Sequence, residues 1–333
     1  MKKVIVTGAA GWIGREVAAS ATALGLEVIA LDAAAESAGP WMAYRVADIA
    51  SDVVLSLASA PALHGAFAVI HCAGYAHRPI ETVDEIKRFH AINRDGTDRV
   101  LELSRRVGIG RIVYLSSIAF YDWRKGCDFD ERGPLASLTA YAESKLAGER
   151  LCRESGLDWR VARLGTVFGN GDRANFAKLA DAMARGRFVV PGKGSARKSV
   201  LPLALAAELL VDLTVRECVP HQLVNVALPI TPTLAEICDG YTRVCAFPRA
   251  KRVPLGLIRA MARFGDIAAA LRPNFPLTSR NVRKLTTSTT VNTDRMIETW
   301  PKRKWGSFEE WLQESADFYR SPFAMKVERR SNN

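Results

Sequence analysis

The fold of this chain is decided by a stretch near its N-terminus, Val4-Ile5-Val6-Thr7-Gly8-Ala9-Ala10-Gly11-Trp12-Ile13-Gly14. The apolar run at its start predicts a buried strand, and residues 13–24 have the pattern of a helix that ends at Gly25. Glycines between a strand and a helix allow a tight turn and let a pyrophosphate approach the helix N-terminus. We therefore expect a phosphate-binding loop whose cofactor contacts are Gly8, Gly11, Trp12, Ile13 and Gly14.

An acidic residue at the end of the second predicted strand indicates which cofactor this loop binds. The apolar run of residues 28–31 leads into Asp32, eighteen residues after Gly14. A carboxylate at this place accepts hydrogen bonds from the adenosine ribose hydroxyls and repels a 2′-phosphate. Ala33 and Ala34 follow, so no arginine stands there to bind that phosphate. We expect NAD rather than NADP, and prefer this to the alternative of a tight turn without a ligand.

Further apolar runs at residues 68–73, 112–115 and 159–164 alternate with helical patterns. Continuous apolar strands that alternate with helices are typical of a parallel sheet covered on both faces. The predicted fold class is α/β, a Rossmann-type doubly wound parallel sheet with a smaller C-terminal α/β substrate lobe. The domains we expect are a cofactor-binding domain at 1–168, a mainly substrate-binding lobe at 169–322 whose chain can cross back to the first domain, and a disordered basic tail at 323–333.

The composition indicates a soluble globular protein of 333 residues, 48% of them hydrophobic and 24% charged. No apolar stretch approaches the roughly 18–20 residues that span a bilayer, and the N-terminal apolar run is too short for a signal peptide. We therefore expect a cytoplasmic protein without stable membrane insertion. The six cysteines contain no Cys-x-x-Cys pair and the five histidines no His-x-x-x-His pair, so we expect reduced thiols and no metal site.

The net charge of +11 is unevenly distributed. Residues 1–150 carry 17 Lys and Arg against 18 Asp and Glu, whereas residues 151–333 carry 29 against 17. The basic second half favours an anionic ligand, and a phosphorylated metabolite fits better than nucleic acid because no nucleic-acid recognition motif is present. The segment from Arg249 to Arg272 alternates basic and apolar residues, which is compatible with a membrane surface or with an ordinary core-facing helix.

A catalytic group is predicted around Tyr141 and Lys145, which are four residues apart and so share one helix face. A phenol has a pKa of about 10, and a nearby ammonium favours the phenolate, which would bring the phenol into the range for acid–base work. Ser117 ends the preceding strand, where parallel-sheet proteins have their ligand crevice. Its hydroxyl can bind the reacting oxygen beside Tyr141.

These features resemble an extended short-chain dehydrogenase/reductase, of the NAD-dependent epimerase/dehydratase family that acts on nucleotide sugars. The likeness covers most of the chain and is closest to UDP-glucose and UDP-N-acetylglucosamine 4-epimerase-like proteins. The motifs that carry it are the loop of residues 7–14, Asp48-Ile49, Val69-Ile70-His71-Cys72-Ala73-Gly74, Asn93-x-x-Gly96-Thr97, Leu115-Ser116-Ser117, Tyr141-x-x-x-Lys145 and Arg163-Leu164-Gly165-Thr166-Val167-Phe168-Gly169.

The resemblance implies further cofactor contacts. Asp48 and Ile49 would flank the adenine, and Ala73 and Gly74 would line the cofactor. Asn93 would support the active site.

The resemblance also implies the catalytic and substrate-binding residues. Ser117, Tyr141 and Lys145 would form the catalytic triad, with Lys145 also holding the nicotinamide ribose. The partner would be a nucleotide-diphosphate sugar, and the protein would be a homodimer. The residues expected to bind the substrate are Ser117, Asn175, Arg197 and Arg280.

The leading functional hypothesis is an NAD-dependent nucleotide-sugar 4-epimerase, which oxidises C4 transiently and returns the hydride to the other face. The alternative is an NAD(P)H-dependent reductase of nucleotide 4-keto-6-deoxy sugars, which uses the same residues once. A dehydratase is disfavoured because Ile118-Ala119 stands where that group carries an acid pair. A dehydrogenase of steroids or other apolar alcohols fits the basic lobe poorly, and a non-enzymatic NAD sensor fits poorly with an intact Ser-Tyr-Lys set.

Overall fold

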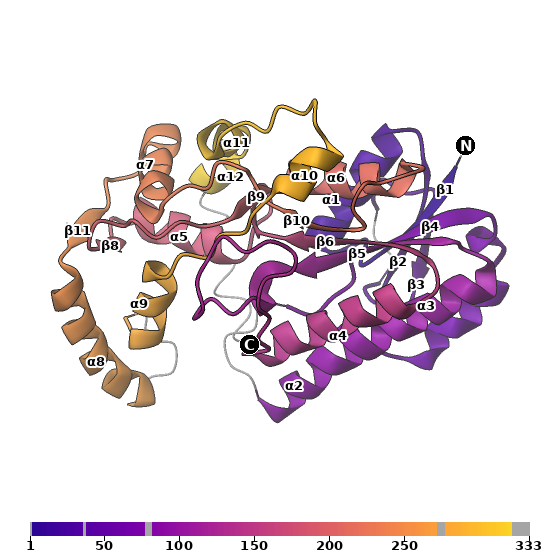
Figure 1. Ribbon diagram of the computed structural model, residues 1–333, viewed down its shortest axis with the longest axis horizontal. Helices are drawn as coiled ribbons and strands as arrows, with labels where there is room; N and C mark the ends of the chain where they lie inside the picture. The colour runs from indigo at the N-terminus through magenta and orange to yellow at the C-terminus, as the bar shows by residue number, and fades with distance from the viewer. Residues whose placement is uncertain (1, 36–37, 77–81, 272–276, 322–333) are drawn as a thin grey trace.

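The central feature of the computed structural model is a seven-stranded parallel sheet in the order β10-β6-β5-β4-β1-β2-β3 (Figure 1). The structure describes residues 2–35, 38–76, 82–271 and 277–321, so Arg272 and the predicted tail at 323–333 lie outside the described residues. From β1 the chain builds outward to β3, returns, and builds outward through β4 on the other side, which is the doubly wound order. The predicted fold class is confirmed. The strands are β1 Lys3–Thr7, β2 Glu27–Asp32, β3 Ala43–Val46, β4 Ala66–His71, β5 Arg111–Ser117, β6 Asp158–Leu164 and β10 Leu223–Val226.

Alternate residues of these strands enter two separate cores, because successive side chains point to opposite faces of a sheet. Val4 and Val6 lie in one core with α1 and α6, whereas Ile5 lies in the other with α3 and α4. Both faces are therefore apolar, as the continuous apolar runs predict. The helices on the two faces are α1 Trp12–Ala23 and α6 Leu203–Val215 on one, and α2 Val83–His90, α3 Gly96–Val107 and α4 Ala140–Glu154 on the other (Figure 1).

Beyond residue 165 the chain builds a smaller lobe and then returns to the sheet. Two short parallel pairs, β7 with β9 and β8 with β11, lie in this part. The chain crosses back when α6 packs against α1 and the sheet, and when β10 adds the seventh strand beside β6. The division at residues 168 and 169 stays a prediction. The elements are β7 Thr166–Phe168, α5 Asn175–Ala184, β8 Val189–Pro191, β9 Val200–Pro202, α7 Leu234–Cys245, β11 Lys251–Val253, α8 Leu255–Leu271, α9 Ser279–Thr286, α10 Asp294–Thr299, α11 Phe308–Glu314 and α12 Ala316–Arg320.

Short helical turns connect the main elements: η1 Asp52–Ser59, η2 Pro61–Leu63, η3 Ala91–Asp95 and η4 Ile118–Phe120. All six cysteines are free. Across the described ranges, no helix combines the length and apolar character needed to cross a membrane.

Candidate active site

The glycine loop between β1 and α1 is packed too tightly for any other residue at two of its positions. Gly8 has a φ of +66°, and a Cβ there would lie 2.7 Å from the backbone of Ala73. A Cβ on Gly14 would lie 2.0 Å from the carbonyl oxygen of Gly8. Gly11 is the N-cap of α1 and has no side chain to bind the first helical N–H groups. These N–H groups are therefore available to a phosphate at the helix N-terminus.

Asp32 is held against this loop by two backbone hydrogen bonds. Its carboxylate accepts from the N–H of Ala10 and from the N–H of Ala34, both at 2.9 Å. The carboxylate is thus fixed at the end of β2, beside the glycine turn, in the position that the sequence predicts for a ribose-binding acid. Trp12 lies at the start of α1 and donates its indole N–H to the carbonyl of Asn170, while Ile13 packs partly buried against the core.

The predicted adenine-flanking pair is divided between surface and core. Asp48 is exposed, and its carboxylate accepts from the N–H of Ala50 at 2.9 Å. Ile49 is buried, because α3 crosses its side chain at Gly96, where a Cβ would lie 2.8 Å from it. Asp48 is therefore the member of the pair whose side chain reaches solvent.

The three predicted catalytic residues come from two adjacent elements. Ser117 is the last residue of β5, whereas Tyr141 and Lys145 lie one turn apart near the start of α4. Ser117 lies close enough to Tyr141 for its hydroxyl to lower the pKa of the phenol, and that hydroxyl also accepts from the N–H of Ala119 at 3.1 Å. Thr139 caps α4 by accepting from the N–H of Ala142, which fixes where the helix begins. The carboxyl end of β5 and the first turn of α4 thus bring the phenol and the serine hydroxyl together.

Lys145 is buried beneath this pair. Its ammonium donates to the carbonyl of Leu115 at 2.5 Å and lies 4.2 Å from the centroid of the Tyr114 ring. Burial lowers the pKa of Lys145 to about 8. Burial raises the pKa of Tyr141, and the opposing effect comes from Ser117. Burial and Ser117 are the influences on the Tyr141 pKa here, and the effect of Lys145 on this phenol stays a prediction.

The end of β4 reaches the same place. A Cβ on Gly74 would lie 3.2 Å from the side-chain oxygen of Asn93 and 3.8 Å from the ammonium of Lys145. The Asn93 amide donates to the carbonyl of Tyr75 at 3.0 Å and to the hydroxyl of Ser144 at 2.9 Å, and its oxygen accepts from the N–H of Tyr75 at 2.7 Å. Asn93 therefore ties the loop after β4 to the catalytic helix.

A buried histidine, which the sequence analysis does not place in the site, supports Ala73. The ring of His71 contacts the hydroxyls of Thr7 at 2.6 Å and Thr97 at 3.0 Å, and the Thr7 hydroxyl accepts from the N–H of Ala73 at 3.3 Å. Burial, and then the charge of Lys145, lower the pKa of His71 to about 3. The imidazole is therefore neutral and positions the cofactor loop without taking part in proton transfer at neutral pH.

A buried polar network holds the loop that joins β5 to α4. Ser116 donates to Glu149 at 2.7 Å, and the Arg163 guanidinium makes two hydrogen bonds to the same carboxylate, at 3.0 and 2.6 Å. Arg163 also donates to the carbonyl of Glu131 at 2.9 Å. Burial alone would lower the pKa of Arg163, but its bonds to Glu149 raise it overall. The guanidinium stays charged, and its hydrogen bond to the Glu131 carbonyl attaches the loop between β5 and α4 to β6.

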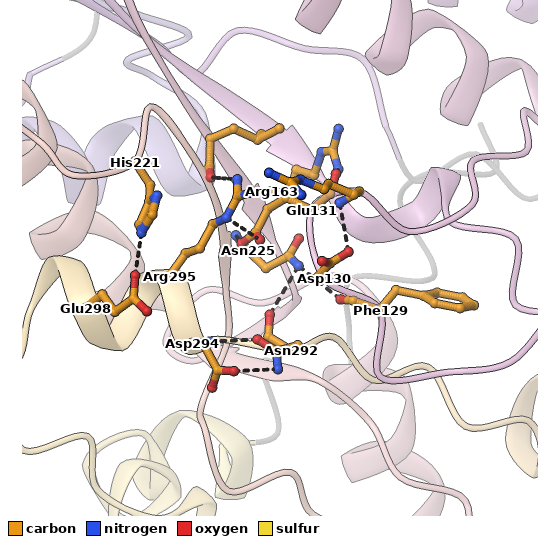
Figure 2. Close-up of polar contacts among 12 residues, drawn as sticks. Phe129, Asp130, Glu131, Arg163, His221, Asn225, Asn292, Asp294, Arg295 and Glu298 are labelled. Atoms are coloured by element: carbon orange, nitrogen blue, oxygen red, sulfur yellow. Dashed lines mark hydrogen bonds and ion pairs between the residues drawn. The ribbon is translucent and has the colours of Figure 1, made fainter.

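Glu131 extends this network to the edge of the sheet, as Figure 2 shows. Its carboxylate accepts from the N–H of Asn225 at 2.7 Å and pairs with Arg295 at 3.2 Å. A cleft of about 560 Å³ opens beside these residues, and His221 on its wall contacts Glu298 at 2.5 Å. The cleft is lined by a different set of residues from those around Tyr141.

In the lobe, four cationic side chains gather from three segments. Lys198 donates to the carbonyls of Lys284 and Thr287 at 2.8 and 2.6 Å, and burial lowers its pKa to about 8. Burial, and then the charges of Arg280 and Lys178, lower the pKa of Lys284. Of these residues the sequence singles out Arg280 alone, because positions 178, 198 and 284 form no motif along the chain. The cluster is suited to an anion.

The other two predicted substrate residues lie around this cluster. Asn175 is exposed at the first position of α5, the helix that carries Lys178. The guanidinium of Arg197 donates instead to the carbonyl of Thr231 at 2.7 Å, so its side chain is engaged away from α9. The structure therefore brings Arg280 into the cationic cluster and leaves Arg197 beside it.

Residues 4–201 match a family described as the NAD dependent epimerase/dehydratase family. The chain belongs to this family. It is a family of enzymes, and its description names NAD as the cofactor. The residues present fit that cofactor, since Gly11 leaves the first N–H groups of α1 uncapped and the Asp32 carboxylate is fixed beside the turn.

Curated members of the epimerase/dehydratase family match about half of the chain. UDP-glucose 4-epimerase 1 of Oryza sativa subsp. japonica is 28% identical over 180 residues, which are 49% of this chain and 50% of that protein. The dTDP-4-dehydrorhamnose reductase of Burkholderia thailandensis is 30% identical over 186 residues, 56% of each chain. The chain thus spans little more than half the length of these relatives.

Solved structures match over nearly the whole chain. The Bordetella bronchiseptica enzyme WbmH, in complex with NAD+, aligns with a TM-score of 0.73 at 20% identity, over 96% of this chain and 99% of that one. UDP-glucose 4-epimerase from Thermotoga maritima, with UDP-glucose, aligns with a TM-score of 0.73 at 19% identity, over 96% and 98%. At this identity the likeness establishes the shared fold.

Proposed function

We propose that this enzyme is a nucleotide-sugar 4-epimerase. The observation that carries the proposal is that Ser117, at the carboxyl end of β5, lies close enough to Tyr141, at the start of α4, to lower the pKa of the phenol, while Gly74 lies near Lys145 of the same helix. Together the phenol and the serine hydroxyl can transfer a proton to or from one oxygen of the substrate. The loop after β4 extends from the glycine turn, at Ala73, to the neighbourhood of Lys145, at Gly74. The cationic cluster of the lobe adds a place for an anionic group of the substrate.

Proton transfer falls to Tyr141. Bound NAD supplies the chemistry of taking a hydride from a sugar carbon and giving it back. As the C4 hydride leaves, the phenolate oxygen of Tyr141 takes the hydroxyl proton, and Ser117 donates a hydrogen bond to the developing carbonyl oxygen. When the keto-sugar has turned and C4 is reduced on its other face, Tyr141 returns the proton.

The substrate diphosphate belongs at the cationic cluster of the lobe. Lys198, Arg280 and Lys284 each carry a positive charge there, and the last two belong to α9. Asn175 stands at the start of α5, the helix that carries Lys178. An anion would offset the mutual repulsion that contributes to the lowered pKa of Lys284.

A second candidate is reduction of a nucleotide 4-keto-6-deoxy sugar. The relative from Burkholderia thailandensis, named dTDP-4-dehydrorhamnose reductase, favours it. In that reaction Tyr141 gives its proton to the reduced oxygen once, and the oxidised cofactor leaves.

Incubation of the purified protein with UDP- and dTDP-sugars, with and without added NADH, distinguishes these functions. Interconversion of C4 epimers without net use of NADH is the expected result, and stoichiometric NADH oxidation would establish the reductase instead. A 3β-hydroxysteroid is included to test the alternative of a dehydrogenase that acts on apolar alcohols. Tight NAD binding with no turnover of any compound would leave a sensor and overturn both proposals.

The variant Tyr141→Phe tests the residue on which the mechanism depends. It keeps the ring and removes the proton-transferring oxygen, so we expect turnover to fall by at least about 10²–10⁴-fold while NAD still binds. Product formation and NADH fluorescence titration measure the two effects. Turnover at the wild-type rate would remove Tyr141 from the mechanism.

The homodimer also stays a proposal. It is supported by Val83 and Ile86, two exposed apolar residues on α2, a helix that flanks the sheet.

A further inference from the structure

Helix α8 carries a stripe of exposed apolar side chains, which we call the α8 stripe: Leu257, Met261, Phe264 and Ile267. Phe264 is 74% exposed and Ile267 is 67% exposed. Leu257, Met261 and Phe264 are spaced four and three residues apart, so they lie along one line of the helix surface. A contiguous apolar patch of this kind marks an interaction surface.

The fold does not need the α8 stripe for its own core. A different face of α8 is buried, with Ile258 at 2% exposure and Ala262 at 0%, and this face packs with Val282 of α9. The helix is therefore attached to the lobe through one side and presents the stripe from another. An ordinary core-facing helix would have one apolar face, whereas this helix has two.

Basic side chains border the α8 stripe. Arg259 and Arg263 are exposed one turn apart on α8, and Ile267 of the stripe follows one turn later on the same ridge. Lys251 and Arg252 are exposed on β11, just before the helix. The carboxylate of Asp266, on α8, accepts a hydrogen bond from the backbone N–H of Ser279 at 2.9 Å. It is therefore directed at the start of α9.

We propose that the α8 stripe docks on an anionic phospholipid bilayer, with the helix axis lying in the plane of the membrane interface. Apolar side chains of this size enter the boundary between headgroups and acyl chains, and flanking arginines bind the phosphates. The positive charge around the α8 stripe indicates which partner binds there. A second copy of this chain would bring like charges together, whereas an anionic surface is complementary to them.

The position of α8 in the molecule allows this contact. Figure 1 shows α8 at the end of the molecule farthest from β1–β3, with α9 on its inner side. Nothing of the sheet stands beyond it in that direction. Since α8 packs directly on α9, docking would also hold Arg280 and Lys284 close to the membrane surface.

Vesicle flotation of the purified full chain tests the proposal. We expect the wild-type protein to float with phosphatidylcholine vesicles that contain phosphatidylglycerol and to bind pure phosphatidylcholine vesicles several-fold more weakly. The double variant Phe264→Ser/Ile267→Ser should lower the partition coefficient for the anionic vesicles at least about tenfold, because two apolar side chains are lost from the interface. Raised salt should weaken wild-type binding, because the arginine contribution is screened.

A matched control is the double variant Val53→Ser/Ile230→Ser, in which the two replaced side chains are each 72% exposed outside α8. It should bind within about twofold of the wild type, and thermal melting verifies that both variants are folded. Failure of the wild type to float with anionic vesicles would overturn the proposal, as would equal binding by the two double variants. Gel filtration adds one more decisive outcome: if the α8 variant dissociates a dimer and vesicle binding is absent, the occupant is a second copy of the chain.

Discussion

At the scale of single residues, the site depends on a phenol whose surroundings work against its ionisation. Burial raises the pKa of Tyr141, and the side chain of Ser117 lowers it. Below the pKa, the phenolate fraction increases about tenfold for each pH unit. The oxidation of a sugar alcohol, in which Tyr141 acts as a base, should therefore accelerate as the pH rises through the neutral range.

The variant Ser117→Ala should move this pH profile upward. Removing an interaction that favours the phenolate raises the pKa of Tyr141, so the rise in kcat/KM should occur at higher pH. Initial rates measured from pH 6 to about 10 give the pH at which each protein reaches a given kcat/KM. The control is Ser116→Ala, because the Ser116 hydroxyl donates to Glu149 and lies in the same strand. Superimposable profiles for wild type and Ser117→Ala would contradict the assigned contact.

At the scale of elements, α4 is joined to β6 by a buried ion pair. The side chains of Arg163 and Glu149 are 1% and 0% exposed, and their charged atoms are 2.6 Å apart. Such a pair contributes little net stability over an apolar pair, but a lone charge left in its place is costly. The pair therefore fixes how the catalytic helix sits on the sheet.

The variant Arg163→Met should destabilise the protein by about 3–5 kcal/mol, because the buried Glu149 carboxylate loses the guanidinium that makes two hydrogen bonds to it. Arg243→Met is the matched control: Arg243 pairs with Glu309 at 2.6 Å, but their side chains are 57% and 41% exposed. An exposed pair contributes at most about 1 kcal/mol. Urea unfolding followed by circular dichroism measures both, and equal losses would contradict the argument from burial.

At the scale of the whole molecule, the sheet is completed by residues that follow the lobe. Helix α6 begins at Leu203 and covers the same face of the sheet as α1, with Leu205, Leu209 and Leu210 almost fully buried. Strand β10 then pairs with β6 as the last strand of the sheet. The two parts of the molecule are therefore interleaved along the chain.

A fragment of residues 1–168 should consequently fail to form the native sheet. It lacks α6, so one face of β4, β5 and β6 would be exposed to water, and apolar surface of that extent promotes association. We expect an aggregated or loosely packed product without a cooperative thermal transition. Calorimetry and near-ultraviolet circular dichroism test this against the full chain. A sharp transition in the fragment would show that the sheet is stable without the later segments.

The sequence by itself determined the parallel sheet and the glycine turn, because these depend on local pattern, whereas the roles of that turn and of Ser117 and Tyr141 stay predictions. A strand followed by glycines and a helix has one way to pack, and residues at the ends of neighbouring parallel strands meet at one edge. Gly8, Gly14 and Asp32 accordingly stand where the sequence places them.

Only the tertiary structure decided where charges and apolar faces meet. Lys145 and Tyr141 share a helix face in the sequence, yet the ammonium is held by the carbonyl of Leu115, from another element. Lys198 and Lys284 are 86 residues apart in the sequence but in contact in the structure, and their spacing does not predict this contact. The apolar face of α8 that remains exposed is likewise a result of which helix packs beside it. Burial and solvation depend on neighbours distant in sequence, so the chemistry of these groups follows from the fold.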